Sequence, residues 1–111
     1  MSKVIIKKGA TFPYYEAFLT TGADSKPLDL TNAKKVTVYL KGRKSKTVTT
    51  GAASIGTPAT SGLVIFKWVA AIYNNVDVYD VEWEIEWNSG EIEILPNDSS
   101  TEEVEVLERV N

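Results

Sequence analysis

Two stretches of the chain alternate regularly between apolar and polar residues. In residues 77–87 the odd positions from Tyr79 onward are apolar or aromatic, and the even positions from Asp80 onward are acidic. Residues 35–41 alternate in the same way, with an apolar residue at every even position. A period of two is typical of a β-strand that buries one of its faces. Both stretches are therefore predicted to be strands.

Turn-forming residues separate these stretches from several shorter apolar segments, at intervals of about eight to twelve positions. Evidence for helix is limited to a turn or two at residues 69–74. We therefore predict a single all-β sandwich domain over residues 1–111. The expected strands cover residues 3–8, 14–20, 35–41, 46–50, 62–68, 77–87, 91–95 and 102–108, with a weak strand at 53–55 inside a loop at 51–61.

A glycine-containing turn at residues 88–90 predicts a hairpin after the longest strand. A two-residue connection would pair Ile85 with Ile94, apolar with apolar. A three-residue connection would instead pair Ile85 with Glu93. Because paired residues of an antiparallel ladder share a face, we predict a two- or four-residue connection.

Length and composition limit the chemistry that is available. A chain of 111 residues has the size of one domain. It contains no cysteine, which excludes disulfides and thiolate metal sites, and no histidine, which excludes histidine-based triads and histidine-ligated zinc. The first eight residues lack an apolar stretch of signal-peptide length, and every apolar run is far shorter than the ~20 residues of a membrane helix. We expect neither a standard export signal nor membrane insertion.

Basic and acidic residues are segregated along the chain. Ten of the twelve lysines and arginines lie between positions 3 and 46, and twelve of the fifteen acidic residues lie between positions 77 and 108. Such asymmetry indicates either a charged partner surface or pairing inside the domain. Pairing inside the domain is favoured by the strand pattern, because Lys35 and Lys41 lie on one alternating strand and the carboxylates lie on another.

An acidic stripe follows the polar face of the longest strand and continues beside it. Alternate residues of a strand lie roughly 7 Å apart, a spacing that fits a cation site or a glycosidase-type carboxylate pair. A glycosidase acid also needs an apolar pocket, which a sheet face does not offer. A solvated face that pairs with lysines is favoured, and a docking surface for a basic partner is the remaining alternative. The stripe comprises Asp80, Glu82, Glu84, Glu86, Glu91 and Glu93.

Two further groups of residues have both a functional and a structural interpretation. A cluster of basic residues lies on an expected hairpin and lacks an aromatic stacking platform, so a solvated turn is favoured over a nucleic-acid site. A group of aromatic residues could form a carbohydrate platform. Trp83 and Trp87 alternate in phase with Val81 and Ile85, however, which favours core packing. The basic cluster is Lys41, Arg43, Lys44 and Lys46, and the aromatic group is Trp68, Trp83, Trp87, Tyr14, Tyr15 and Phe18.

The segment at residues 69–76 is too apolar for a free loop. It either covers one end of the sandwich or packs against a neighbouring subunit, and we favour the subunit contact. The candidate interface residues are Val69, Ile72, Tyr73 and Val76. We assign no catalytic, cofactor-binding or metal-ligating residue.

Residues 75–81 resemble the tyrosine corner of immunoglobulin-type sandwiches. In that motif an acidic residue, a small residue, a tyrosine and a cysteine recur at alternate positions. Asn75, Asp77, Tyr79 and Val81 occupy these positions here, so the tyrosine is kept and valine replaces the cysteine. The resemblance implies an immunoglobulin-like antiparallel β-sandwich of about 7–9 strands.

Short motifs along most of the chain are similar to the N-terminal immunoglobulin-like domain of phage baseplate upper proteins. The chain departs from that family at residues 69–77, which are largely apolar where the family has an acidic "D-x-D" cluster and a glycine. The matching motifs are a lysine-glycine turn at 8–9, a "DLT-x-A" corner at 29–33, a "VT-x-x-L/M-K" strand at 36–41, a "TG-x-V-x-Y-x-W" strand at 61–68, a tyrosine strand at 79–86, a glycine hairpin at 89–90 and a proline-asparagine loop at 96–97.

The resemblance implies a virion structural protein, a tail or baseplate module that forms a ring or docks another subunit. Its implied partners are other virion proteins and further copies of itself, without nucleic acid, enzymatic activity or a cofactor. Its implied location is the virion, after synthesis in the host cytoplasm. A carbohydrate- or cell-surface-binding module is the main alternative function, and a small carboxylate hydrolase is a weaker one.

Overall fold

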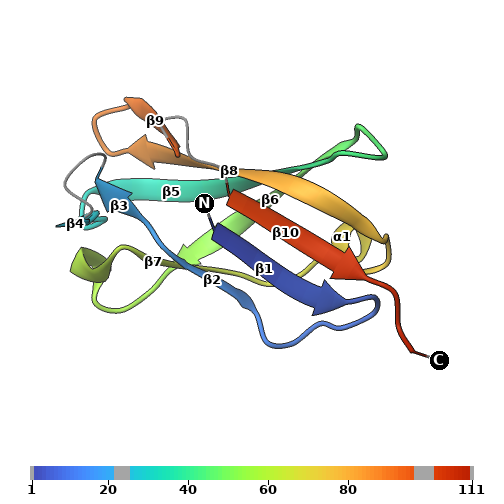
Figure 1. The fold of residues 1–111 in the computed structure, drawn as a ribbon. Helices are drawn as coiled ribbons and strands as arrows, with labels where there is room; N and C mark the ends of the chain where they lie inside the picture. Colours follow the sequence, from blue (N-terminus) through green and yellow to red (C-terminus); the bar gives the residue numbers. More distant parts are fainter. Residues whose placement is uncertain (1, 22–25, 97–101, 111) are drawn as a thin grey trace.

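The computed structural model describes residues 2–21, 26–96 and 102–110, and strands dominate them (Figure 1). The described residues contain ten strands, one short α-helix and one short 3₁₀ helix. The all-β prediction is confirmed, and the α-helix lies within the helical turn predicted at 69–74. The elements are β1 (Ser2–Lys7), β2 (Tyr15–Phe18), β3 (Thr20–Thr21), β4 (Lys26–Pro27), β5 (Ala33–Gly42), β6 (Val48–Ile55), η1 (Ala59–Ser61), β7 (Leu63–Phe66), α1 (Ala70–Tyr73), β8 (Asp77–Trp87), β9 (Ile92–Leu95) and β10 (Glu102–Leu107).

Eight of these strands form one continuous sheet in the order β1-β10-β8-β5-β6-β7-β2, with β9 added on β8. Strands β3 and β4 pair with each other in a separate two-stranded ribbon. The pairing of β1 with β10 is parallel, whereas the other pairs are antiparallel. The first and last strands of the described chain therefore lie side by side (Figure 1).

The sheet curls into a nearly closed, barrel-like shape because β6 changes partner along its length. Its first six residues pair with β5, and Ser54 and Ile55 pair with β7. This brings β2 and β7 over the inner face of β8. The Tyr15 ring of β2 lies 5.3 Å from the Trp83 ring of β8 and stacks at 5.4 Å on the ring of Trp68. One apolar core fills the space between the two halves of the sheet.

Strand β8, which has the strongest alternating pattern, buries one face and exposes the other, as predicted. In β8 the side chains of Tyr79, Val81, Trp83 and Ile85 are buried, and the acidic side chains between them face outward. Strand β5 lies beside β8 in an antiparallel register. The register places Lys35 opposite Glu86 and Lys41 opposite Asp80, as the segregated charges predicted.

The strand predicted at residues 14–20 is interrupted at Leu19, which divides it into β2 and β3. The Leu19 side chain is buried, its N–H donates to the Gly62 carbonyl, and its own carbonyl accepts from the Leu28 N–H. These bonds join the chain to two different segments, so β2 continues beside β7 while β3 turns toward β4.

Strand β6 begins two residues later than the strand predicted at 46–50 and runs on through the weak strand predicted at 53–55, which is confirmed. The prediction of a loop over residues 51–55 between them is wrong. The segment rich in alanine, glycine and serine extends as strand to Ile55. Its intrinsic strand propensity is weak. Pairing with β5 and then with β7 nevertheless satisfies its backbone, so the tertiary context decides its conformation.

The hairpin prediction is wrong in register. Ile85 pairs with Glu93, and the connection at residues 88–90 has three residues, closed by a Gly90 N–H bond to the Trp87 carbonyl. Gly90 has a φ of +93°, as the bulge position of a three-residue connection requires. This register buries Leu95 opposite Trp83, near the centre of the core. The cost is that two isoleucines, Ile92 and Ile94, face outward at 52% and 47% exposure.

Candidate functional site

The predicted interface segment at residues 69–76 divides between the core and the surface. Ile72 is fully buried and belongs to the chain's own core, which leaves it out of reach of a neighbouring subunit. Val69 and Tyr73 are half-buried and pack against the same core. Val76 is 39% exposed and remains available at the surface. The segment thus covers one end of the domain and presents a single large apolar residue to solvent.

A surface groove runs between this segment and the hairpin that joins β5 to β6. Its volume is about 450 Å³. The Tyr79 side chain lies at its inner end, where its hydroxyl donates to the Asn75 carbonyl at 3.1 Å. This bond from a tyrosine to the backbone four residues upstream is the one that defines a tyrosine corner. The residues that line the groove are Lys44, Ser45, Thr47, Thr49, Ala71, Asn75, Val76, Asp77 and Tyr79.

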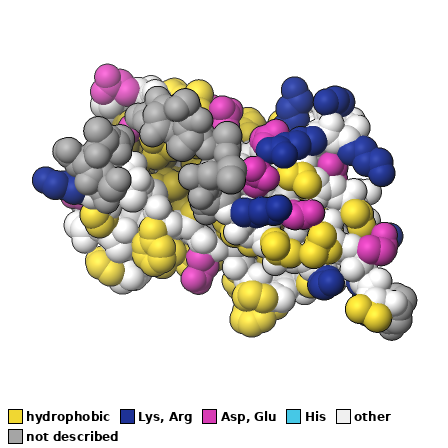
Figure 2. All heavy atoms as spheres, viewed as in Figure 1, with side chains coloured by type: hydrophobic (Ala, Val, Ile, Leu, Met, Phe, Trp, Pro, Cys, Tyr) yellow, Lys and Arg dark blue, Asp and Glu magenta, His cyan; other side chains and the backbone are white. Residues whose placement is uncertain are grey.

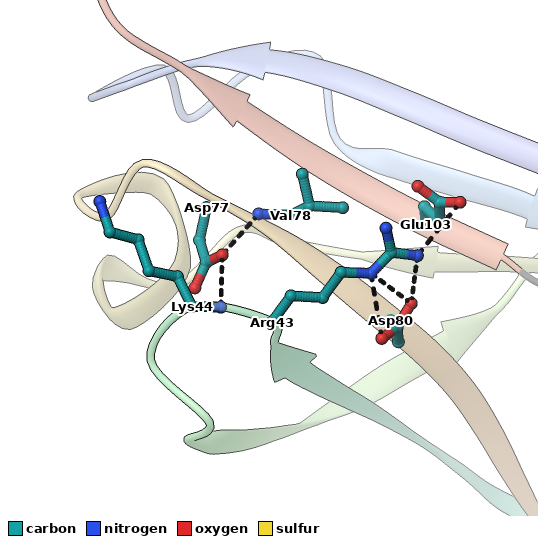
Figure 3. Close-up of polar contacts among 6 residues, drawn as sticks. All are labelled: Arg43, Lys44, Asp77, Val78, Asp80 and Glu103. Atoms are coloured by element: carbon teal, nitrogen blue, oxygen red, sulfur yellow. Dashed lines mark hydrogen bonds and ion pairs between the residues drawn. The ribbon is translucent and has the colours of Figure 1, made fainter.

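Asp77 fixes the hairpin wall of this groove (Figure 3). Its carboxylate accepts backbone N–H bonds from Lys44 at 3.0 Å, Ser45 at 3.1 Å and Val78 at 2.8 Å. Burial acts to raise the pKa of Asp77, but these N–H donors stabilise the charged form more strongly, so its pKa lies below the ordinary value. The carboxylate that looks most like a ligand in this groove therefore acts as a brace for the turn.

We expect Asp77→Ala to lower the free energy of unfolding by about 1 kcal/mol at pH 7, because three backbone donors lose an ionised acceptor near the surface. The folded pKa is depressed, so this stabilisation is present above the unfolded pKa of about 4 and is lost as pH falls through the folded value. Urea unfolding of both proteins at about pH 7 and about pH 2 measures the difference. A gap between them that does not shrink in acid would contradict this account.

Ion pairs engage two residues of the outward acidic stripe, Asp80 and Glu86. Arg43 contacts Asp80 at 2.7 Å and the nearly buried Glu103 at 3.3 Å (Figure 3). Lys34 and Lys35 both approach Glu86, at 3.5 and 3.6 Å. The predicted solvated and paired face is thus observed for part of the stripe. Among residues 2–21, 26–96 and 102–110, no group of three or more carboxylates is arranged to hold a metal ion.

The tryptophans pack into or against the core, and for Trp83 and Trp87 this agrees with the phase of their strand. Trp83 is fully buried, Trp68 is 7% exposed and Trp87 is half-buried. Each indole N–H has an acceptor, at 2.7 Å on the Pro13 carbonyl for Trp68, and at 3.2 Å on Glu102 for Trp83 and on Glu93 for Trp87. Of the predicted aromatic group, Tyr14 and Phe18 are exposed, and Tyr15 is buried with the tryptophans.

Sequence reasoning overlooked Glu102, a carboxylate that points inward. It accepts hydrogen bonds from the Tyr15 hydroxyl and from the indole N–H of Trp83. Burial, followed by the nearby charge of Glu102, raises the pKa of Tyr15 far above its ordinary value. A signal was present, because Glu102 has the same phase along its strand as the inward residues Val104 and Val106.

Large apolar side chains are exposed at strands that pair on one side only. Within the described residues, β1, β2 and β9 each have a single pairing partner. Figure 2 shows hydrophobic side chains along the part of this face where β1 and β2 lie, and basic side chains around the hairpin between β5 and β6. The exposed apolar residues on or just before these three strands are Ile5, Phe12, Tyr14, Phe18, Ile92 and Ile94.

No known family model matches this sequence, and no curated protein shows significant similarity to it. In the part of the chain that the structure covers, no helix is long and apolar enough to cross a membrane.

Proposed function

We propose that this chain is a structural assembly module of a phage tail or baseplate, built as an immunoglobulin-like β-sandwich. It acts in the virion through protein–protein contacts with other tail proteins and with copies of itself. The short motifs that resemble phage baseplate upper proteins support the assignment to this class. The hydrogen bond from Tyr79 to the Asn75 carbonyl supports the immunoglobulin-like fold, because the tyrosine corner is a hallmark of that family.

One observation carries the assembly function: exposed apolar side chains accompany three strands with an open edge. An open edge presents unpaired N–H and C=O groups that can pair with another strand. Here Ile5 lies on β1 at 55% exposure, Phe18 lies on β2 at 66%, and Phe12 just before β2 reaches 73%. Edges that combine free backbone groups with apolar side chains are suited to bind another strand.

The carbohydrate-binding alternative receives less support from the same surface. All three tryptophans lie in the described residues, and each is buried or half-buried. A sugar platform built from these tryptophans would need flat indole faces at the surface. The exposed Tyr14 is covered on one side by Lys67, whose ammonium lies 5.5 Å from the ring centroid.

The absolute mass in solution, measured by light scattering across a wide range of protein concentration, tests the proposal. We expect a species larger than the 12.2 kDa monomer, whose population grows with concentration. Phe18→Ser and Val76→Ser then distinguish an open edge from the groove as the contact. A protein that remains monomeric at every concentration would contradict the assembly function.

A further inference from the structure

We propose that the open edge of β1 binds the open edge of β9 in a second copy of this chain, so that copies join head to tail. This inference rests on the proposed assembly function and names its partner and contact. A heterologous contact of this kind joins two different surfaces of identical subunits, and it generates a ring if the rotation closes.

The two edges carry opposite charges. The outward face of β1 presents Lys3, Ile5 and Lys7, and Lys8 follows directly. These residues belong to the basic half of the chain. On the other surface, β9 is flanked by Glu91 at its start and pairs with the acidic strand β8. Opposite charges at the two edges favour β1 against β9 and disfavour contact between two copies of β9.

Both edges also present isoleucines on the outward face of the sheet. Ile5 is 55% exposed at the centre of β1, and Ile92 and Ile94 are 52% and 47% exposed on β9. In β9 they lie opposite Glu86 and Glu84 of β8. If β1 of a second copy paired with this edge, its Ile5 would lie beside Ile92 and Ile94. The lysine side chains of β1 would then point toward Glu84 and Glu86. Contact between the edges would cover part of the apolar surface of all three isoleucines.

The carboxylates that flank β9, Glu86 on β8 and Glu91 before β9, are not fully neutralised inside the chain. Lys34 and Lys35 pair with Glu86, whereas the Glu91 carboxylate accepts a hydrogen bond only from the Ser89 hydroxyl among the contacts of the described residues. On β1, the side chain of Lys3 is engaged with Glu105 at 2.7 Å, so Lys7 and Lys8 are the lysines to alter without breaking an internal ion pair. Because the contact relies on exposed charges, raising the ionic strength should weaken it.

Reciprocal charge reversal in the full-length chain tests this contact. Variant A carries Lys7→Glu and Lys8→Glu, and variant B carries Glu84→Lys and Glu91→Lys. Each variant alone places like charges at the contact, so the concentration at half-assembly should rise by about tenfold or more. In an equal mixture, the acidic β1 of A meets the basic β9 of B, and the basic β1 of B meets the acidic β9 of A. The mixture should recover assembly to within about threefold of the wild type.

A matched control separates the edges from net charge. The double variant Lys26→Glu with Lys46→Glu changes the charge as much as variant A does, and neither residue lies on β1, on β9 or in the groove lining. It should assemble like the wild type, and near-UV circular dichroism checks that every variant keeps its packed aromatic core.

The outcomes distinguish this contact from the broader function. If the wild type assembles but A and B assemble equally well, or if mixing fails to restore assembly, the β1–β9 contact is overturned and the assembly function stands. If Phe18→Ser disrupts assembly while A and B do not, the contact lies at β2 instead. A wild type that never assembles overturns both proposals.

Discussion

Trp83→Ala is expected to lower the free energy of unfolding by about 3–5 kcal/mol, the range for removing a large aromatic side chain from a core. Trp83 is fully buried, and its ring packs 5.3 Å from that of Tyr15. The substitution also deprives Glu102 of the indole N–H bond at 3.2 Å. Domains of this size typically have a free energy of unfolding of about 5–15 kcal/mol, so this substitution would remove a large part of the protein's stability.

Urea unfolding followed by far-UV circular dichroism measures this effect without relying on tryptophan fluorescence. Trp83→Phe is the matched control, because it keeps an aromatic ring in the core and removes the N–H donor. Its expected cost is smaller, about 1–2 kcal/mol. Equal losses for the two variants would show that the hydrogen bond to Glu102, and not the packed volume, dominates at this position.

Gly62→Ala is expected to destabilise the protein by about 2–4 kcal/mol, through a combination of backbone strain and overlap. Gly62 has a φ of +76°, and a Cβ there would collide with the Leu19 carbonyl oxygen. It would also approach the Leu28 nitrogen at 3.1 Å. Both neighbours are backbone atoms that hold β2 and β3 in place, so they have little freedom to move aside.

Gly90→Ala provides the control for this second prediction. Gly90 has a similar φ of +93°, but nothing lies within 4 Å of the position that a Cβ would take. The substitution should therefore cost only the left-handed strain, about 1 kcal/mol. The difference between the two thermal or urea midpoints isolates the overlap with Leu19, and equal effects would contradict it.

The long alternating strands were predictable because their pattern and their packing agree. In residues 36–41 of β5 and 79–87 of β8, each inward residue is apolar or aromatic and each outward residue is charged or polar, so the sequence leaves one choice of face. The pairing of basic with acidic strands also followed from charge, and the contacts of Lys35 with Glu86 and of Arg43 with Asp80 agree with it.

The hairpin register could not be read from the sequence, since two apolar patterns compete in β9. Ile92 and Ile94 indicate one face, and Leu95 indicates the other. Leu95 is buried because it reaches the core beside Trp83, whereas the isoleucines lie near the rim of the sheet. The interruption at Leu19 was equally hidden, because it depends on bonds to Gly62 and Leu28 from other parts of the chain.

The sequence indicated which segment borders the candidate site, but only partly which of its residues are exposed there. The apolar stretch at 69–76 does border a groove, but a short helix turns Ile72 inward and leaves Val76 outward. The open edges escaped sequence reasoning because exposure at an edge depends on strand order. Nothing local to Ile5 or Phe18 indicates that β1 and β2 end the sheet.

The parallel pairing of β1 with β10 has a consequence for synthesis on the ribosome. Strand β1 leaves the exit tunnel long before β10, its pairing partner among the described residues, because the register joins Ser2 to Glu102 and Lys7 to Leu107. Loop closure over such a separation is slow, and β1 must wait unpaired while the rest of the domain emerges. Lys3, Lys7 and Lys8 make this unpaired segment positively charged. The charge would protect it from aggregation until β10 has been synthesised.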